Sequence, residues 1–289
     1  MRAVTGGVTV RSDVPDERPG GGEPSEPEER LRVSQALAAA AKGLDPGGVP
    51  EALCRACVAL LPVSDASVSI SGGAIVQATW CAGDPTAARL AEAQYTLGDG
   101  PCRSAVRQAT TVLAADLTTA PDSGRRPVFA HEAITLGVRA VFSLPLGVGA
   151  AAVGTLDLYR HTPGGLSARD LRIALWTRDA VTFALMELHA GSRAAERAGE
   201  EGVASWLEAS EAGHGEVYQA VGMVMVQLDL DPEQALDRMR ARAFTQGRTV
   251  TEVARDVLAR RLRFASERDV GSEGTRRRDA GGDGREDDR

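Results

Sequence analysis

Near its C-terminus the chain reads Tyr218-Gln-Ala-Val-Gly-Met-Val-Met-Val-Gln-Leu228, then Asp231-Pro-Glu-Gln-Ala-Leu236, and finally Arg248-Thr-Val-Thr-Glu-Val-Ala-Arg-Asp-Val257. In each stretch the apolar residues recur at helical spacing, so that they fall on one side of a helix. The stretches are short and closely spaced, and each needs partners for its apolar side. The sequence therefore predicts a small bundle of three amphipathic helices.

Two of these helices have readable starts. Asp231 is a good N-cap, and Pro232 suits the first helical position that follows it. Thr249 followed three residues later by Glu252 is a capping box, in which each side chain bonds the other residue's backbone. Gly247 can end the second helix. These signals set the helix boundaries independently of the apolar spacing.

Arginine is concentrated in the second and third helices. From 235 to 263 there are eight arginines against three acidic residues, in a chain whose net charge is −7. The planar guanidinium can bond a phosphate or a base edge with two parallel hydrogen bonds. A basic helical face favours nucleic acid as its ligand, although such a run can also be only a solvated face. The candidate contacts are Arg238, Arg240, Arg242, Arg248, Arg255 and Arg260.

These residues resemble the ANTAR domain, an RNA-binding antitermination module, over about fifty residues. The matches are Ala220 and Gly222, then Ala235, Met239, Arg240 and Ala243, then Arg248, Val250, Val253, Ala254 and Val257. One departure is Val221, where the family usually has lysine. The resemblance implies that the bundle is packed through Ala220, Gly222, Ala235, Met239, Ala243, Val253, Ala254 and Val257.

Gly222 lies inside the first predicted helix. Glycine there costs about 1 kcal/mol relative to alanine. We expect the cost to be offset by close approach of another helix or of RNA to bare backbone. The alternative is that Gly222 faces solvent.

The part of the chain before the bundle alternates between helical and strand-like patterns. Two predicted hairpins cover 66–80 and 141–159, and a further strand covers 111–117. Helices are predicted at 28–42, 50–61, 103–108, 127–136 and 167–189, the last with Ser167 as N-cap, and 95–102 is predicted to be a loop. The fold class is α+β, with an antiparallel sheet flanked by helices and followed by a small all-α bundle.

This order resembles a GAF domain over about 29–190. The resemblance rests on Leu97-Gly-Asp-Gly-Pro-Cys102, Thr111-Val-Leu-Ala-Ala-Asp116 and the pair Ser143-Leu-Pro-Leu146 with Gly154-Thr-Leu-Asp-Leu158. It implies a sheet with helices on one side and a small-molecule pocket on the other. The expected pocket residues are Asp99, Gly100, Cys102, Asp116 and Arg139. The combination with the bundle looks like the GAF–ANTAR regulators of actinobacteria.

The sequence leaves the cofactor unidentified. A GAF pocket could hold a cyclic nucleotide, haem or nothing. Haem needs an axial ligand, and His131 is the one histidine in the pocket half, where a lone histidine is more often structural. Pocket glycines can serve turn geometry alone, and Asp116 can be a strand-end cap.

Four cysteines are present: Cys54, Cys57, Cys81 and Cys102. Cys54 and Cys57 form a C-x-x-C, but they lie on an amphipathic helix without histidines at ligand spacing, so we expect structural cysteines and no metal site. Cys81 and Cys102 lie near the expected pocket edge. They leave open an alternative, a GAF-fold reductase that uses thiols.

The predicted organisation is a disordered tail at 1–27, a GAF-like sensor at 28–190, a linker at 191–214, the ANTAR bundle at 215–263 and a disordered tail at 264–289. The early residues lack a signal peptide's apolar run, and no stretch approaches eighteen consecutive apolar residues, so we expect a cytoplasmic protein without membrane contact. We expect no enzyme. The predicted partners are RNA hairpins, RNA polymerase indirectly through the nascent transcript, a small-molecule ligand in the sensor and a second copy held by the helices at 29–42 and 167–190. A DNA-binding or protein-binding regulator is a further alternative.

Overall fold

The sensor is built on a five-stranded antiparallel sheet. The computed structural model describes residues 25–45, 48–72, 76–148, 151–198 and 205–265. Its strands lie in the order β2-β1-β5-β4-β3. They are β1 (Asp65–Gly72), β2 (Val76–Ala82), β3 (Val112–Ala114), β4 (Ala140–Val148) and β5 (Ala151–Arg160). Both predicted hairpins are present, while β3 is shorter than the predicted strand.

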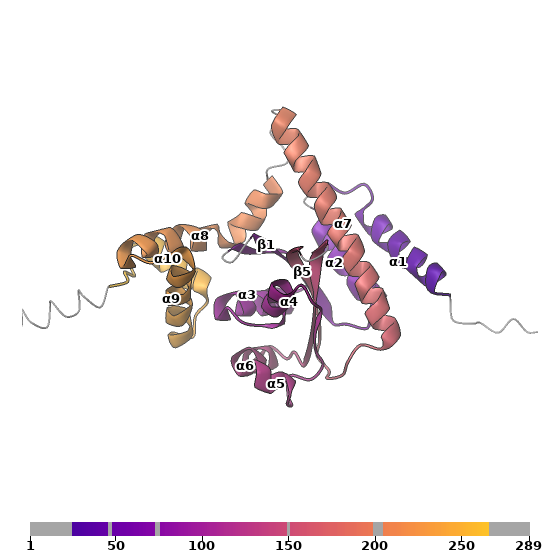
Figure 1. Cartoon of the computed structure of the whole chain (residues 1–289), viewed down its shortest axis with the longest axis horizontal. Coiled ribbons are helices and arrows are strands. Elements are labelled where there is room, and N and C mark those ends of the chain that lie inside the picture. Colours follow the sequence, from indigo (N-terminus) through magenta and orange to yellow (C-terminus); the bar gives the residue numbers. More distant parts are fainter. Residues whose placement is uncertain (1–24, 46–47, 73–75, 149–150, 199–204, 266–289) are drawn as a thin grey trace, which may run out of the picture.

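Three helices cover one face of this sheet: α1 (Glu26–Ala41), α2 (Val49–Leu60) and α7 (Ala168–Ala198). In Figure 1 the long α7 and α2 lie on one side of the strands, with α1 outside them. Leu156 and Leu158 of β5 point to this face, where they join the apolar residues of α2 and α7. Ser167 Oγ accepts the Asp170 N–H (3.1 Å), as the predicted N-cap of α7 should.

The opposite face is covered as well, by α3 (Pro85–Leu97) and α4 (Pro101–Gln108), with α5 (Asp122–Arg125) and α6 (Pro127–Thr135) beyond them. This corrects the expectation of helices on one side alone. It also corrects the predicted loop at 95–102, whose first three residues belong to α3. The missed helix begins at Asp84, whose carboxylate accepts the Ala87 N–H (2.6 Å), and ends at Gly98 in the left-handed conformation (φ 66°).

The C-terminal bundle consists of α8 (Ser205–Leu228), α9 (Pro232–Thr245) and α10 (Val250–Leu258). The predicted capping box of Thr249 with Glu252 is confirmed, and the predicted N-cap Asp231 forms a second capping box with Gln234. Gly247 follows α9 with φ 60°, which supports its predicted role as a stop. Helices extend into the predicted linker from both sides, since α7 runs to Ala198 and α8 starts at Ser205.

The predicted tails lie mostly outside the described residues. At their inner edges, α1 already begins at Glu26, with Ser25 in a capping box with Glu28. Among the described helices, none has both the length and the apolar character required to cross a bilayer.

Two of the cysteines are joined, because a disulfide links Cys54 of α2 to Cys81 of β2. Cys57 and Cys102 are buried outside any disulfide. In the described part of the chain, no group of three or more His, Cys, Asp or Glu side chains could hold a metal ion.

Candidate functional site

Three of the predicted basic positions are exposed on the bundle: Arg238 and Arg242 of α9, and Arg260 just after α10. Arg238 and Arg242 are four residues apart, so they share one helical face. No ion pair or hydrogen bond joins their side chains to another described residue. They are therefore available to a ligand without breaking an internal contact.

Two further predicted arginines, Arg248 and Arg255, lie at the surface but form ion pairs with carboxylates of the bundle. Arg255 lies 2.7 Å from Glu216 of α8. Arg248 lies 2.8 Å from Asp256 and donates to the Glu252 carbonyl (3.0 Å). Hydrogen bonds from Arg261 and Arg248 hold the pKa of Asp256 below its usual value. A phosphate could replace Glu216 or Asp256 as the partner of these arginines, because ion pairs at the surface are weak.

Arg240 departs from the prediction of an exposed contact. Its residue is only 9% exposed. Its Nε donates to the Tyr95 carbonyl of α3 (3.0 Å), its Nη1 lies 3.1 Å from Asp237, and its guanidinium lies 5.5 Å from the Tyr95 ring. Burial, followed by the nearby charge of Arg103, lowers the pKa of Arg240. In this structure Arg240 binds the sensor, and it is not free for RNA.

The rest of the contact between the sensor and the bundle also comes from α3. Thr96 Oγ1 accepts the Val250 N–H (3.1 Å), one of the backbone donors that a helix leaves open at its first turn. Glu92 Oε1 accepts from the Thr251 hydroxyl (3.0 Å). A carboxylate near the N-terminus of α10 is favourably placed relative to the helix dipole. Helix α3 thus caps α10 from outside the bundle.

Aromatic and histidine side chains close the same contact. The Tyr95 ring lies 4.0 Å from the His214 ring of α8, and His214 Nε2 lies 3.0 Å from Glu92 Oε2. Tyr95 belongs to the apolar cluster of the bundle although it is part of the sensor. Burial raises its pKa. The sensor therefore contributes one side chain to the core of the bundle.

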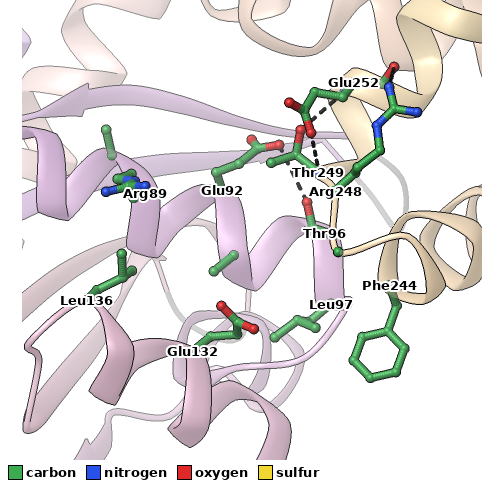
Figure 2. A pocket seen from close by; sticks show the side chains of 13 residues that line it. Arg89, Glu92, Thr96, Leu97, Glu132, Leu136, Phe244, Arg248, Thr249 and Glu252 are labelled. Carbon is green, nitrogen blue, oxygen red and sulfur yellow. Dashed lines mark hydrogen bonds between the residues drawn. The ribbon is translucent and has the colours of Figure 1, made fainter.

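A cavity of about 590 Å³ lies beside this contact, between α3 and α6 on one side and the α9–α10 turn on the other. Figure 2 shows Leu97, Glu132 and Leu136 on the sensor side and Phe244 and Arg248 on the bundle side. Its walls mix apolar and charged side chains of both signs. Phe244 is an exposed aromatic at its edge.

Most of the predicted packing residues lie in the core of the bundle. Fully buried there are Ala220, Ala235, Met239, Ala243, Val253, Ala254 and Val257. Gly222 is exposed, and a Cβ added to it would meet nothing within 4 Å, so the expected close approach of another helix is wrong. Val221, at the position where lysine is usual, is buried.

The residues predicted to line a sensor pocket each make contacts with nearby groups, and a pocket formed by them stays a prediction. Asp99 is exposed and accepts the Gly100 N–H (2.8 Å), and Asp116 caps Thr118 and Thr119. Arg139 donates to the carbonyls of Ile134 and Val138. Cys102 is buried, and its N–H donates to Gln94 of α3 (2.9 Å). The bonds from Thr118 and Thr119 to Asp116 agree with the alternative prediction, in which Asp116 caps the chain just after a strand.

A buried acid that the sequence did not single out lies on the α4-covered face of the sheet. Asp157 of β5 accepts hydrogen bonds from Ser143 and from Thr155 (3.0 Å). Burial raises its pKa to about 6, although these two hydrogen bonds act in the opposite direction. Alternation along β5 could have indicated this, because Asp157 lies between two inward leucines and must therefore face the other layer.

Sequence reasoning missed Glu92, Tyr95 and Thr96 because it missed α3. A signal for that helix was available. Asp84-Pro85 repeats the N-cap and first-turn pattern of Asp231-Pro232.

The comparisons with known proteins agree with both parts of this architecture. A family model described as ANTAR domain matches residues 207–258, and one described as GAF domain matches residues 44–185. No curated protein matches the chain.

Similar solved structures include two GAF domains from phosphoenolpyruvate-protein phosphotransferases. The one from Acinetobacter is 11% identical, with 58% of this chain and 96% of that chain covered and a TM-score of 0.44. The one from Coxiella burnetii is 11% identical, with coverages of 58% and 99% and a TM-score of 0.45. A free methionine-R-sulfoxide reductase from Neisseria meningitidis is 14% identical, with coverages of 56% and 90% and a TM-score of 0.40. These likenesses are too weak to indicate a ligand or an activity.

GAF domains are sensor domains, and ANTAR domains are RNA-binding antitermination domains; both are typically regulatory rather than catalytic. The antiparallel sheet with its flanking helices and the separate helical bundle are the structures that these two matches require. The chain therefore carries a GAF domain followed by an ANTAR domain.

Proposed function

We propose that this protein is a signal-responsive regulator that binds paired hairpins in nascent RNA through its ANTAR domain and so promotes transcription antitermination. RNA polymerase is affected indirectly, through the transcript, and the protein acts in the cytoplasm as a regulator without catalytic activity. The observation that carries the proposal is the pair Arg238 and Arg242, exposed and without internal partners on one face of α9.

The chemistry of these two arginines suits RNA loops. Loop bases are unstacked, so a guanidinium can bond their edges or stack on their faces, which the deep groove of an RNA duplex does not allow. Arg260 lies at the end of the same bundle, and Arg255 and Arg248 can exchange their carboxylate partners for phosphates. The net acidity of the chain limits binding elsewhere on its surface.

A titration separates this function from DNA binding. Hairpin RNAs with randomised loops and a duplex DNA of equal length are titrated at several salt concentrations. We expect tighter binding to the hairpins, with an affinity that falls as salt rises. Binding to the duplex that equals or exceeds binding to every hairpin would favour a DNA-binding regulator instead.

We further propose that the protein is a homodimer held by α1 and α7. Phe183 is 63% exposed and Leu31 is 57% exposed, and Met186 is exposed as well. A groove of about 400 Å³ between the two helices is lined by Leu37, Trp176 and Phe183 among others. Two copies would hold two hairpins at once, which raises the effective concentration of the second.

The signal is proposed to be a small molecule bound by the GAF domain, and its identity is open. The reductase alternative would use Cys81 and Cys102. Cys81 is bonded to Cys54, and Cys102 is buried. An assay for thiol-dependent sulfoxide reduction, with Cys102→Ala as its control, tests that alternative, and we expect no turnover.

A further inference from the structure

We propose that α3 of the GAF domain is an intramolecular inhibitor of RNA binding, and that RNA and α3 compete for one side of the ANTAR bundle. The inference rests on the proposed function, since it concerns the regulation of the same RNA-binding surface. It starts from Arg240, which matches a basic position of the ANTAR pattern and yet is buried against Tyr95.

The contact uses groups of the bundle that a phosphate or a base could otherwise bond. Arg240 gives its Nε proton to the Tyr95 carbonyl, and the Val250 N–H at the start of α10 is taken by Thr96. Helix N-termini attract anions, and the Glu92 carboxylate lies beside the N-terminus of α10. The sensor thus satisfies donors on the side of the bundle that faces it.

Charge across the neighbouring cavity acts against RNA in the same arrangement. Arg248 lies on the bundle side of this cavity, whereas Glu92 and Glu132 line it from the sensor side (Figure 2). A phosphate approaching Arg248 there would meet these two carboxylates and one cation, Arg89, so the sensor side of the cavity is net negative. Like charges at short range are unfavourable, and more so where solvent is partly excluded. RNA can use Arg240 and Arg248 together only after the bundle leaves α3.

The closed arrangement also carries a cost that favours release. Arg240 Nη2 and His214 Nδ1 are buried without a hydrogen-bond partner among the described residues. Arg240 additionally lies in the field of Arg103. Buried polar groups without partners lose their hydration and gain nothing in return. Separation of the bundle from α3 would return these groups to water. This gain lowers the free-energy cost of opening the contact.

Helix α3 is placed to connect this contact to the interior of the sensor. Gln94, which precedes Tyr95 in α3, accepts the Cys102 N–H at the start of α4, and α4 packs on β3, β4 and β5. Tyr95 and Thr96 follow at once and face the bundle. A shift of α3 that a signal produces in the sensor would therefore change both contacts together.

The test compares the full chain with Glu92→Ala/Thr96→Val, which removes bonds to α10 without altering any basic position of the bundle. Glu51→Ala, the loss of an exposed carboxylate on α2, is the matched control. With the randomised-loop hairpin RNAs as probe, we expect the double variant to bind about tenfold more tightly, because it loses three interdomain hydrogen bonds, to Val250, Thr251 and His214. The control should bind like the unmodified chain. A variant that is merely destabilised would bind more weakly, so the sign separates release from damage.

Hydrogen exchange on the unmodified chain provides the second measurement. Saturating hairpin RNA should speed exchange of the amides in α3, because the bundle no longer covers that helix. Adding Arg240→Ala to the double variant should then weaken binding, because the released arginine contacts RNA. Equal affinities for the parent and the double variant, or RNA bound with the amides of α3 as protected as in the free protein, would overturn the inference and leave the proposed function standing. Absence of hairpin binding by all variants would overturn both.

Discussion

At the scale of single residues, exposure divides the arginines of the ANTAR domain into separate groups. Arg238, Arg242 and Arg260 face solvent, Arg248 and Arg255 are paired on the surface, and Arg240 is buried against the sensor. Arginines that carry the same charge in the sequence are therefore not equally available to a ligand. Only the first group can contact RNA without any rearrangement.

We predict that Arg238→Ala and Arg242→Ala each weaken hairpin binding and leave helix content unchanged. Loss of one bidentate contact should cost about 1–3 kcal/mol, by analogy with contacts to base edges. A gel-shift titration, with circular dichroism on the same samples, measures both quantities. Arg107→Ala, an exposed arginine of α4, is the control. Unchanged affinity for both variants would remove α9 from the RNA interface.

Gly222 gives a prediction opposite to the one its helical position suggested. Because its Cβ would meet nothing within 4 Å, Gly222→Ala should stabilise the protein, by about 1 kcal/mol, and Gly222→Leu should fold normally. Gly247→Ala is the matched contrast, since Gly247 has φ 60° and alanine there should cost about 1 kcal/mol. Thermal melts measure whether each substitution raises or lowers the stability of the protein. A lower melting temperature for Gly222→Ala would show a contact that the structure does not contain.

At the scale of elements, caps and alternation predicted much of the fold. The two hairpins, α2, α6, α9 and α10 follow from apolar spacing and N-cap residues that act locally. The contact between α3 and the bundle could not be predicted this way, because it joins residues about 150 positions apart and depends on which side of a missed helix faces outward. Arg240 shows why: it is buried by Tyr95 of the sensor, and nothing in the spacing of its own helix indicates that contact. Asp116 and Arg139, two of the expected pocket residues, bond nearby backbone and hydroxyl groups, and their role in a sensor pocket stays a prediction.

Asp84 connects two elements. Its substitution should therefore lower the free energy of unfolding more than the substitution of an ordinary helix cap does. It caps α3 and also accepts the Tyr159 hydroxyl of β5 (2.6 Å). Asp231→Ala, which removes only a cap of α9, should cost about 1 kcal/mol. We predict a larger loss for Asp84→Ala, measured as the change in the free energy of unfolding in urea. Equal losses would show that the bond to Tyr159 contributes nothing.

Asp157 should make the stability of the sensor depend on pH. Its pKa is raised by burial to about 6 in the folded protein, so the folded state holds the proton more tightly than the unfolded state. The stabilisation is complete below about pH 4 and is lost as pH rises through 6, by roughly 3 kcal/mol. We expect Asp157→Asn to flatten the pH dependence of unfolding in urea over this window. A parent and a variant with the same slope would contradict the assignment.

At the scale of the whole molecule, the two domains share one core contact on α3 and present different surfaces outward. Helices α1 and α7 expose the large apolar side chains Leu31, Phe183 and Met186, and α9 exposes Arg238 and Arg242. We predict that Phe183→Glu converts a dimer into a monomer, because it places a charge in the proposed α1–α7 interface. Val128→Glu, on exposed α6, should leave the dimer intact. Light scattering at tens of micromolar measures the mass, and a monomeric parent would contradict the assembly.

The central claim is that this chain binds hairpins in nascent RNA through its ANTAR domain. The most direct test is to crosslink the protein to RNA in cells, recover the bound sequences and fold them. Its control is the Arg238→Ala/Arg242→Ala chain expressed at the same level. The account predicts enrichment of paired hairpins located ahead of transcription terminators, and loss of that enrichment in the control. Recovery of no RNA above the level of the control, or of RNAs without paired hairpins, would contradict it.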